Sequence, residues 1–317
     1  MTLGIVFGSL TPPEQLTTGA ARAEQLGFGE LWFSEDCFFS GGMSGVAQLL
    51  AATREVPVGL GLASVMTRHP AVLAMEIAGL ARMHPGRFRA GLGLGNRHWL
   101  RQMGLDTDRP LTAVGESFDA VRALLAGQEI DKPTYAHHFG QIRLDHPPIR
   151  LPQLWIGAVN RRALRLAGAK ADGVLLSVLA GPAYIRWARA EIARGAAAAG
   201  RKMPRITVFT LAAVDDDPAI ARYAVRDAVG FFVRAEAHTA LVGQSALPAT
   251  HGAEIGDREV GEFAVAGTPA QVAAGLDELY AAGADSIGLW LFPGDSFAAV
   301  LERMACDVVP LIGTGTH

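Results

Sequence analysis

The stretch Gly91-Leu92-Gly93-Leu94-Gly95 decides between the two folds that the sequence allows. A dinucleotide-binding Rossmann fold needs G-x-G-x-x-G after an early strand, and the motif opens a helix. Here the glycines follow a G-x-G-x-G spacing, lie on the fourth strand-like run at 87–94, and open no helix. The pattern therefore disfavours an open doubly wound sheet and favours a closed barrel.

Apolar, β-branched runs alternate with helical segments along most of the chain. Eight runs are typical of buried strands: 3–7, 31–33, 56–63, 87–94, 154–156, 174–178, 206–214 and 286–291. Near-continuous apolar strands with helices between them indicate a parallel sheet that is covered on both faces. Eight such units predict an α/β protein with the fold of a (β/α)8 TIM barrel.

The alternation stops in two places, at about 96–152 and at about 236–266. Insertions in a TIM barrel usually cover the C-terminal mouth, where the active site lies. We therefore expect residues 1–317 to form a single barrel domain whose mouth carries both insertions.

Composition excludes several classes of protein. Half of the 317 residues are hydrophobic and 19% are charged, which rules out a disordered chain. The net charge of -3, without any run of Lys or Arg, gives no support for a nucleic-acid partner. Charged residues or proline interrupt each apolar stretch before it reaches the ~20 residues of a membrane span. The N-terminus lacks a basic leader and the two cysteines make no disulfide framework, so we expect a cytoplasmic protein.

Polar residues directly after the strand-like runs are the candidate site residues. Glu35 and Asp36 follow the second run, where carboxylates either serve a ligand or cap the next helix. Asn160, Arg161 and Arg162 lie between a strand and a helix, where free N–H groups and two cations suit an anion such as a phosphate. The same turn is equally compatible with solvated arginines that bind nothing.

Motifs of other enzyme classes are missing. The sequence contains no G-x-S-x-G elbow, no Walker loop and no H-E-x-x-H, so it lacks the common hydrolase and kinase signatures. His137 and His138 have no metal-ligand spacing to Cys, Asp or Glu, and we expect no metal site. Cys37 would lie at the mouth, where packing is a commoner role for cysteine than nucleophilic attack.

Several short segments together resemble the luciferase-like monooxygenase superfamily, and within it the actinobacterial oxidoreductases that use the deazaflavin coenzyme F420. They follow the family's order over nearly the whole chain: Leu31 to Asp36, Ser64 to Thr67, Pro70 to Ala74, Pro85 to Phe88, Gly91 to Gly95, Leu154 to Ala158, and Gly267 to Asp285. The resemblance implies a barrel of the bacterial-luciferase type with a flavin-type ring in its C-terminal mouth.

The resemblance also implies which residues hold the cofactor. Ser64–Val65 match a bulge at the end of the third strand, where family members carry a non-prolyl cis peptide bond behind the ring. The other matching positions are Glu35, Thr67, Gly95 and Trp99 near the ring, and Val159, Asn160, Arg162 and Ala163 at the phosphate-bearing tail.

The chain departs from the sugar-phosphate dehydrogenases of this family at three positions. Asp36, Asn96 and Ala180 stand where those enzymes carry a histidine, a glutamate and a phosphate-binding lysine. A sugar phosphate is therefore not the expected substrate. Asp36 and His98 are the two candidates for catalytic proton transfer, since a carboxyl in a partly dry mouth can have a raised pKa. The alternative for Asp36 is a role in fixing the loop.

We expect an oxidoreductase that transfers a hydride between coenzyme F420 and a small organic substrate, in either direction. The first alternative is an FMN-dependent monooxygenase fed by a separate flavin reductase, which shares the barrel and the phosphate turn. The second is a non-catalytic carrier of flavin or deazaflavin, because the relatives' acid–base residues are absent.

Two further expectations concern packing. Proteins of the family are usually homodimers, and Trp155 and Trp290 are residues that such an interface could hide. The 37 glycines exceed ordinary usage. We expect those in or beside three strands to let the backbone approach a flat ring and its phosphate tail: Gly59, Gly61, Gly91, Gly93, Gly95 and Gly157.

Overall fold

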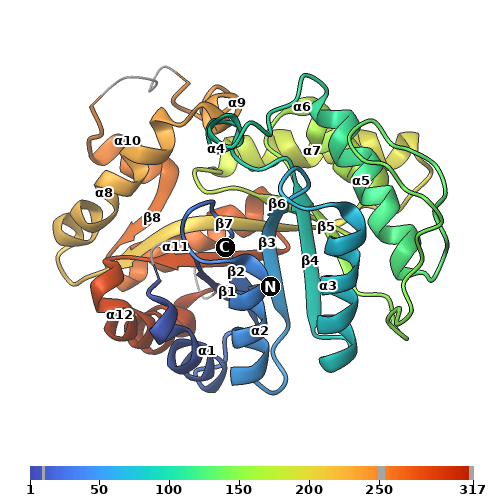
Figure 1. Cartoon of the computed structure of the whole chain (residues 1–317). Coiled ribbons are helices and arrows are strands. Elements are labelled where there is room, and N and C mark those ends of the chain that lie inside the picture. The colour runs from blue at the N-terminus through green and yellow to red at the C-terminus, as the bar shows by residue number, and fades with distance from the viewer. Residues whose placement is uncertain (9–10, 249–253, 314–317) are drawn as a thin grey trace.

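The computed structural model describes residues 1–8, 11–248 and 254–313, and its centre is a closed ring of parallel strands (Figure 1). In ring order these are β1 (Thr2–Phe7), β2 (Glu30–Phe33), β3 (Val58–Ser64), β4 (Phe88–Gly93), β5 (Gln153–Gly157), β6 (Gly173–Leu176), β7 (Arg205–Val214) and β9 (Ser286–Leu291). The ring closes where β1 pairs with β9, Leu3 opposite Ile287. The predicted TIM barrel is therefore confirmed.

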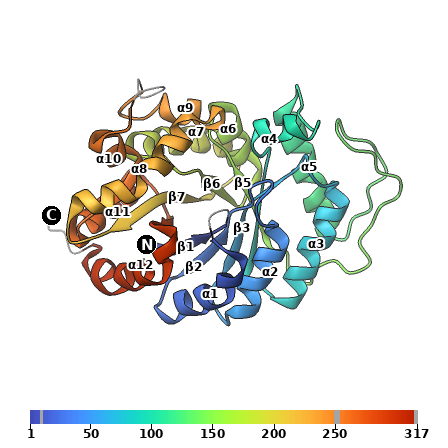
Figure 2. The same cartoon turned by 60° about the vertical axis from the view of Figure 1, so that its left-hand side comes forward.

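Helices surround this ring (Figure 2). The longer ones are α1 (Leu16–Gln25), α2 (Gly42–Ala52), α3 (Pro70–Met83), α5 (Pro110–Leu125), α6 (Arg161–Lys170), α7 (Pro182–Ala198), α8 (Pro218–Arg234) and α11 (Pro269–Ala282), and α12 (Phe297–Arg303) follows the last strand. Five of them begin at a proline. The first helical position favours proline, because an N–H there would have no partner within the helix.

One strand is missing from the prediction. β8 (Ala264–Gly267) pairs with the last residues of β7, Leu211 to Val214, beyond the point where β6 ends. It begins within the last residues of the insertion 236–266, which also holds α9 (Thr239–Val242) and α10 (Asp257–Phe263); residues 249–253 of this insertion are outside the described part. The expectation that strand alternation stops here is wrong, because four small residues are too few to show a strand pattern.

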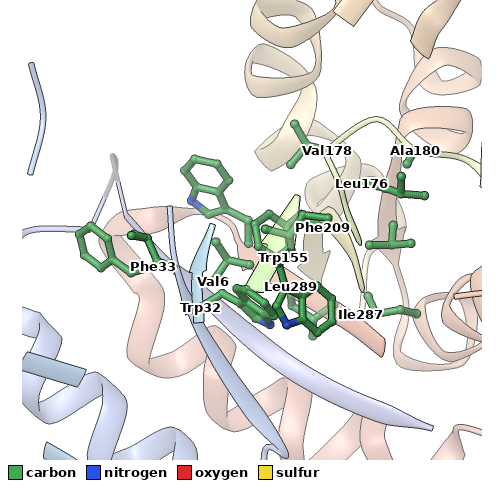
Figure 3. Packing of buried hydrophobic residues seen from close by; sticks show 14 of the residues in the cluster. Val6, Trp32, Phe33, Trp155, Leu176, Val178, Ala180, Phe209, Ile287 and Leu289 are labelled. Atoms are coloured by element: carbon green, nitrogen blue, oxygen red, sulfur yellow. The ribbon is translucent and has the colours of Figure 1, made fainter. Parts of the chain in front are cut away.

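Large aromatic side chains fill the barrel, and glycines on neighbouring strands make room for them. Trp32 packs edge-on against Trp155 and Phe209, at ring-centroid distances of 5.2 and 5.7 Å (Figure 3). A Cβ on Gly59 would lie 2.2 Å from the Trp32 ring, and one on Gly173 would lie 2.3 Å from Trp155. These indoles fit only because the facing strand positions carry no side chain.

The expected cofactor-shaped hollow at the strand glycines is therefore wrong. The space where Cβ atoms of Gly59, Gly61, Gly91, Gly93, Gly95 and Gly157 would lie is taken by Trp32, Phe209, Leu60, Leu62 and Ser64. Except at Gly95, which is exposed beyond the end of β4, protein atoms fill the positions that a ring was expected to approach.

The irregularity in β3 also lies earlier than predicted. The non-prolyl cis peptide bond joins Gly61 to Leu62, not Ser64 to Val65. The pairing of β3 with β4 shifts register in the same place, between Leu60 and Ala63. Ser64 pairs regularly with the neighbouring strand, so the bulge expected at Ser64–Val65 is absent because that position holds no extra residue.

Trp155 and Trp290, which the sequence suggested for a hidden dimer interface, are instead buried within the subunit. Trp155 has no exposed surface, and Trp290 packs against Phe232 at a centroid distance of 5.9 Å. The predicted interface role is wrong for both, because their strands turn these side chains into the protein.

A buried ion pair closes the N-terminal end of the barrel, away from the mouth. Glu30 is fully buried and accepts hydrogen bonds from Trp32 Nε1 at 2.9 Å and from Arg89 Nη1 at 2.5 Å. Arg205 Nη2 lies 3.6 Å from the same carboxylate. Removing one member of such a buried pair is costly, because it leaves an uncompensated charge.

Helices α6 and α7 approach each other backbone against backbone. A Cβ on Gly168 of α6 would lie 2.1 Å from the Ile192 carbonyl oxygen, and one on Gly195 of α7 would lie 2.0 Å from the Arg165 carbonyl oxygen. The crossing therefore depends on glycine at both positions.

Candidate functional site

The ends of β2 to β5 carry most of the predicted site residues on one side of the barrel mouth. Glu35, two residues after β2, accepts hydrogen bonds from both Nη atoms of Arg68, at 2.7 and 2.8 Å. It also accepts one from Gly42 N at 2.8 Å, at the start of α2. The hydrogen bond to Glu35 raises the pKa of Arg68. Glu35 thus fixes the mouth loop and caps α2.

The ends of β3 and β4 meet at Ser64 and Gly95. Ser64 Oγ donates to the Leu94 carbonyl at 2.5 Å, and Thr67 Oγ1 donates to the Ser64 carbonyl at 3.1 Å. A Cβ on Gly95, whose φ is +84°, would lie 2.9 Å from Ser64 Cβ. With the buried Val65, four predicted cofactor residues therefore form one corner of the mouth.

A short helix, α4 (Arg97–Gln102), brings Trp99 against the loop that follows β2. The Trp99 ring lies edge-on to Phe38 and Phe39, at centroid distances of 6.5 and 6.4 Å. These contacts join the loop of Glu35 to α4.

Asp36 and His98, the two proton-transfer candidates, lie on this same side. Asp36 is half-buried, and its main-chain carbonyl accepts from Phe39 N at 3.3 Å. His98 is exposed on α4, where its main-chain N–H donates to the capping Asn96 Oδ1 at 2.9 Å. Their catalytic roles stay predictions.

The turn between β5 and α6 is held from two directions. Asn160 Oδ1 caps α6 by accepting from Ala163 N at 3.2 Å. The Val159 carbonyl accepts the hydroxyl of Tyr184 at 2.6 Å, from the first turn of α7. Burial raises the pKa of Tyr184, so the phenol keeps the proton that makes this bond.

Arg162 differs from the other arginines near this turn in its lack of an ion pair within the described residues. It is exposed and has no ion-pair partner within the described residues. Arg161 and Arg165, in contrast, lie 3.6 and 2.7 Å from the buried carboxylate of Glu191, which also binds Arg194. The helix N-terminus and one guanidinium together suit an anion.

The end of β6, next to β5, carries a buried histidine that was not predicted from the sequence. His238 is 8% exposed, and its Nε2 lies 2.9 Å from Oγ of Ser177, the first residue after β6. Burial lowers the pKa of His238 to about 4. The ring packs edge-on against Phe232 at a centroid distance of 5.4 Å. Because the two residues are 61 positions apart, no local motif signals the pair.

An ion pair joins the two insertions beside the mouth. Arg101 Nη2 on α4 lies 2.7 Å from Glu236 Oε2, two residues before His238. The hydrogen bond lowers the pKa of Glu236. The segments that carry His98 and His238 therefore lie side by side at the mouth.

Two hydrogen-bond partners of the predicted site residues, Arg68 and Tyr184, were not predicted from the sequence. Arg68 directly follows Thr67 at a strand end, so a search for a cation opposite Glu35 could have found it. Tyr184 lies within a helical pattern, where nothing distinguishes it from a core residue.

Among the described residues, neither a metal site nor an activated cysteine is supported. These residues contain no group of three or more His, Cys, Asp or Glu that could hold a metal. Near His137 and His138, His69 caps α3 through Nδ1, which accepts from Ala71 N at 3.1 Å. Burial raises the pKa of the Cys37 thiol, which disfavours a thiolate. Within the described residues, no helix is long and apolar enough to cross a membrane.

Comparison with known proteins finds relatives over nearly the whole length. The family model of the luciferase-like monooxygenases matches residues 5–286. The 5,10-methylenetetrahydromethanopterin reductase of Methanolobus tindarius is 29% identical over 305 residues, which cover 90% of this chain and 93% of that protein.

Solved structures share the same fold. The coenzyme F420-dependent tetrahydromethanopterin reductase of Methanopyrus kandleri has a TM-score of 0.83 at 23% identity, with 98% of each chain covered. The oxygenating constituent of 3,6-diketocamphane monooxygenase from Pseudomonas putida, in complex with FMN, has a TM-score of 0.78 at 17% identity, again with 98% of each chain covered.

Proposed function

The chain belongs to the luciferase-like monooxygenase family, and we propose that it is an oxidoreductase that transfers a hydride between coenzyme F420 and a small organic substrate. The full-length similarity to a methylenetetrahydromethanopterin reductase supports a reductive hydride transfer. The observation that carries the proposal is the turn before α6, where a capped helix N-terminus and Arg162 offer donors to a phosphate-bearing cofactor.

The donors at this turn fit the cofactor's phosphate. First-turn N–H groups of α6 lack partners within the helix, and the Val159 carbonyl is turned to Tyr184 rather than toward an anion. The proposed tail contacts are Val159, Asn160, Arg162 and Ala163, and the proposed ring contacts are Glu35, Ser64, Val65, Thr67, Gly95 and Trp99. When bound, F420 would supply or accept the hydride.

The chain's own groups would handle the proton and exclude water. Asp36 is the first candidate to hold a proton at its carboxyl oxygen, since the Glu35–Arg68 pair fixes its loop. His98 is the second, through a ring nitrogen. Trp99 with Phe38 and Phe39 forms an apolar edge that would limit water beside both groups.

Titration of the purified protein with F420 and with FMN, followed by tryptophan quenching, tests the proposal. We expect F420 to bind and Arg162→Gln to weaken binding about 10- to 100-fold, the range for a lost charge-assisted hydrogen bond. Arg161→Gln is the matched control, because this neighbouring arginine is also exposed but pairs with Glu191. Equal losses in the two variants would contradict the proposed turn.

The second candidate function is an FMN-dependent monooxygenase, which the shared fold of the FMN-bound monooxygenase constituent favours. Tight FMN binding without any response to F420 would replace the first proposal by this one. Tight F420 binding with no turnover of carbonyl, imine or enone substrates would favour a carrier.

We also propose a homodimer, formed through α3. Val72, Met75 and Met83 share one face of this helix and are 45%, 56% and 66% exposed. Gly79 lies among them with no atom within 4 Å of where its Cβ would be, so a second helix could approach closely. Sedimentation velocity should show a dimer that Met75→Lys dissociates, and an unchanged dimer in this variant would exclude α3 as the interface.

A further inference from the structure

The Ser177 side chain belongs to the inner side of the barrel mouth. On β6 the Leu175 side chain lies inside the barrel, since its Cδ1 would be 2.9 Å from a Cβ on Gly91 and 3.3 Å from one on Gly61. Alternate residues of a strand point to the same face. Ser177 follows Leu175 by two positions, directly after β6, and is half-buried, which places its hydroxyl at the inner side of the mouth.

His238 fixes this hydroxyl from the second insertion. Nδ1 of His238 is buried and has no hydrogen-bond partner in the described chain. A buried N–H without an acceptor is rarer in proteins than a buried bare acceptor. The proton therefore belongs on Nε2, which donates to Ser177 Oγ over 2.9 Å.

This assignment leaves the Ser177 hydrogen available. Oγ accepts from His238, and within residues 1–8, 11–248 and 254–313 the hydroxyl has no other partner. A hydroxyl carries one donor and two acceptor sites, so the O–H can still donate to a molecule in the mouth. A serine nucleophile does not fit, because Nδ1 lacks the carboxylate that orients the histidine in a catalytic triad.

We propose that Ser177 donates a hydrogen bond to a carbonyl or hydroxyl oxygen of the substrate, and that His238 is the positioning residue that aims it. The pair lies at the end of β6, the strand that pairs with β5, and is therefore next to the proposed cofactor turn after β5. The Arg101–Glu236 ion pair holds the segment of His238 against α4, which carries the proposed ring contact Trp99. The identity of the substrate oxygen rests on the proposed hydride transfer.

Steady-state kinetics with reduced F420 and a panel of small ketones and aldehydes test the pair. Ser177→Ala and His238→Phe should each lower kcat/KM about 10- to 100-fold and leave the F420 dissociation constant within about threefold. The double variant should be no worse than either single variant, because His238 acts through Ser177. His238→Gln, which keeps a side-chain N–H donor, should recover most of the activity.

Ser245→Ala is the matched control, because Ser245 is buried in the same insertion but donates to the Val242 carbonyl at 2.7 Å. It should leave kcat/KM within about threefold. Multiplied losses in the double variant, full activity in His238→Phe, or an equal loss in Ser245→Ala would overturn the proposal.

A measurement without cofactor separates this inference from the proposed function. Nitrogen-15 NMR of histidine-labelled protein at pH 7 should show His238 with a protonated Nε2 and a bare Nδ1, and Ser177→Ala should shift the Nε2 signal. A proton on Nδ1 would overturn the positioning role, whatever the cofactor. If the wild-type protein does not bind F420, only the proposed hydride transfer is refuted. The same variants would then be assayed with FMN.

Discussion

The close backbone contact between α6 and α7 predicts that one added methyl group on α7 lowers the stability of the protein. In Gly195→Ala the new Cβ would lie 2.0 Å from the Arg165 carbonyl oxygen, whereas ordinary contacts begin at 3.4 Å. The helices must therefore separate by about 1 Å or more. Overpacking of this kind costs about 1–3 kcal/mol or more, while alanine contributes about 1 kcal/mol of helix propensity. We expect a net loss of up to about 2 kcal/mol.

The matched control is Gly115→Ala on α5, which faces α6 from its other side. A Cβ there would meet Leu166 at 3.6 Å, an ordinary contact. The propensity gain should then prevail and raise the free energy of unfolding by about 0.5–1 kcal/mol. Urea unfolding followed by circular dichroism measures both variants. If Gly195→Ala is as stable as Gly115→Ala, the steric argument for the crossing is refuted.

Three other predictions concern buried polar groups. Glu30→Gln should lower the free energy of unfolding by about 3–5 kcal/mol, because it leaves the Arg89 cation uncompensated; a loss under about 1 kcal/mol by urea unfolding would contradict this. Tyr184→Phe should lower the free energy of unfolding by about 1 kcal/mol and weaken F420 binding several-fold, because it frees the Val159 carbonyl. Unchanged F420 affinity in quenching titrations would show that the Tyr184–Val159 hydrogen bond does not support binding. His238 has a pKa of about 4 when folded and about 6.5 when unfolded, so the unfolded state binds more protons and stability falls as pH drops from about 6.5 toward 4. The loss between pH 7.5 and pH 5 should be about 2 kcal/mol larger in wild type than in His238→Phe, and equal losses would show that His238 does not cause it.

The eight ring strands could be predicted because each is a compact apolar run. Leu154-Trp155-Ile156, for example, has no polar interruption, and its burial on both faces follows from that pattern. β8 could not be predicted, since Ala264–Gly267 is short and forms only beyond the end of β6. The barrel glycines show the same limit: sequence indicates that a close approach occurs, but not that Trp32 and Leu62 are what approaches.

Half of the candidate site could be predicted in the same way. Glu35, Ser64 and Asn160 lie at a strand end or within three residues after one, so chain order fixes their place at the mouth. Their partners come from elsewhere: Arg68 lies 33 positions from Glu35, and His238 lies 61 positions from Ser177. Only the folded chain brings such residues together, because no helical or strand period relates them.

The position of α7 has a consequence for how substrate preference could change. Its first turn holds the Val159 carbonyl through Tyr184, and it begins at Pro182, five residues after Ser177. A single helix, α7, therefore fixes the distance between the proposed binding turn for the cofactor tail and the proposed substrate contact at Ser177. A change of substrate during evolution would disturb the fold least if it came from substitutions in the segment around His238. Helix α7 and the glycines at its contact with α6 could then stay unchanged.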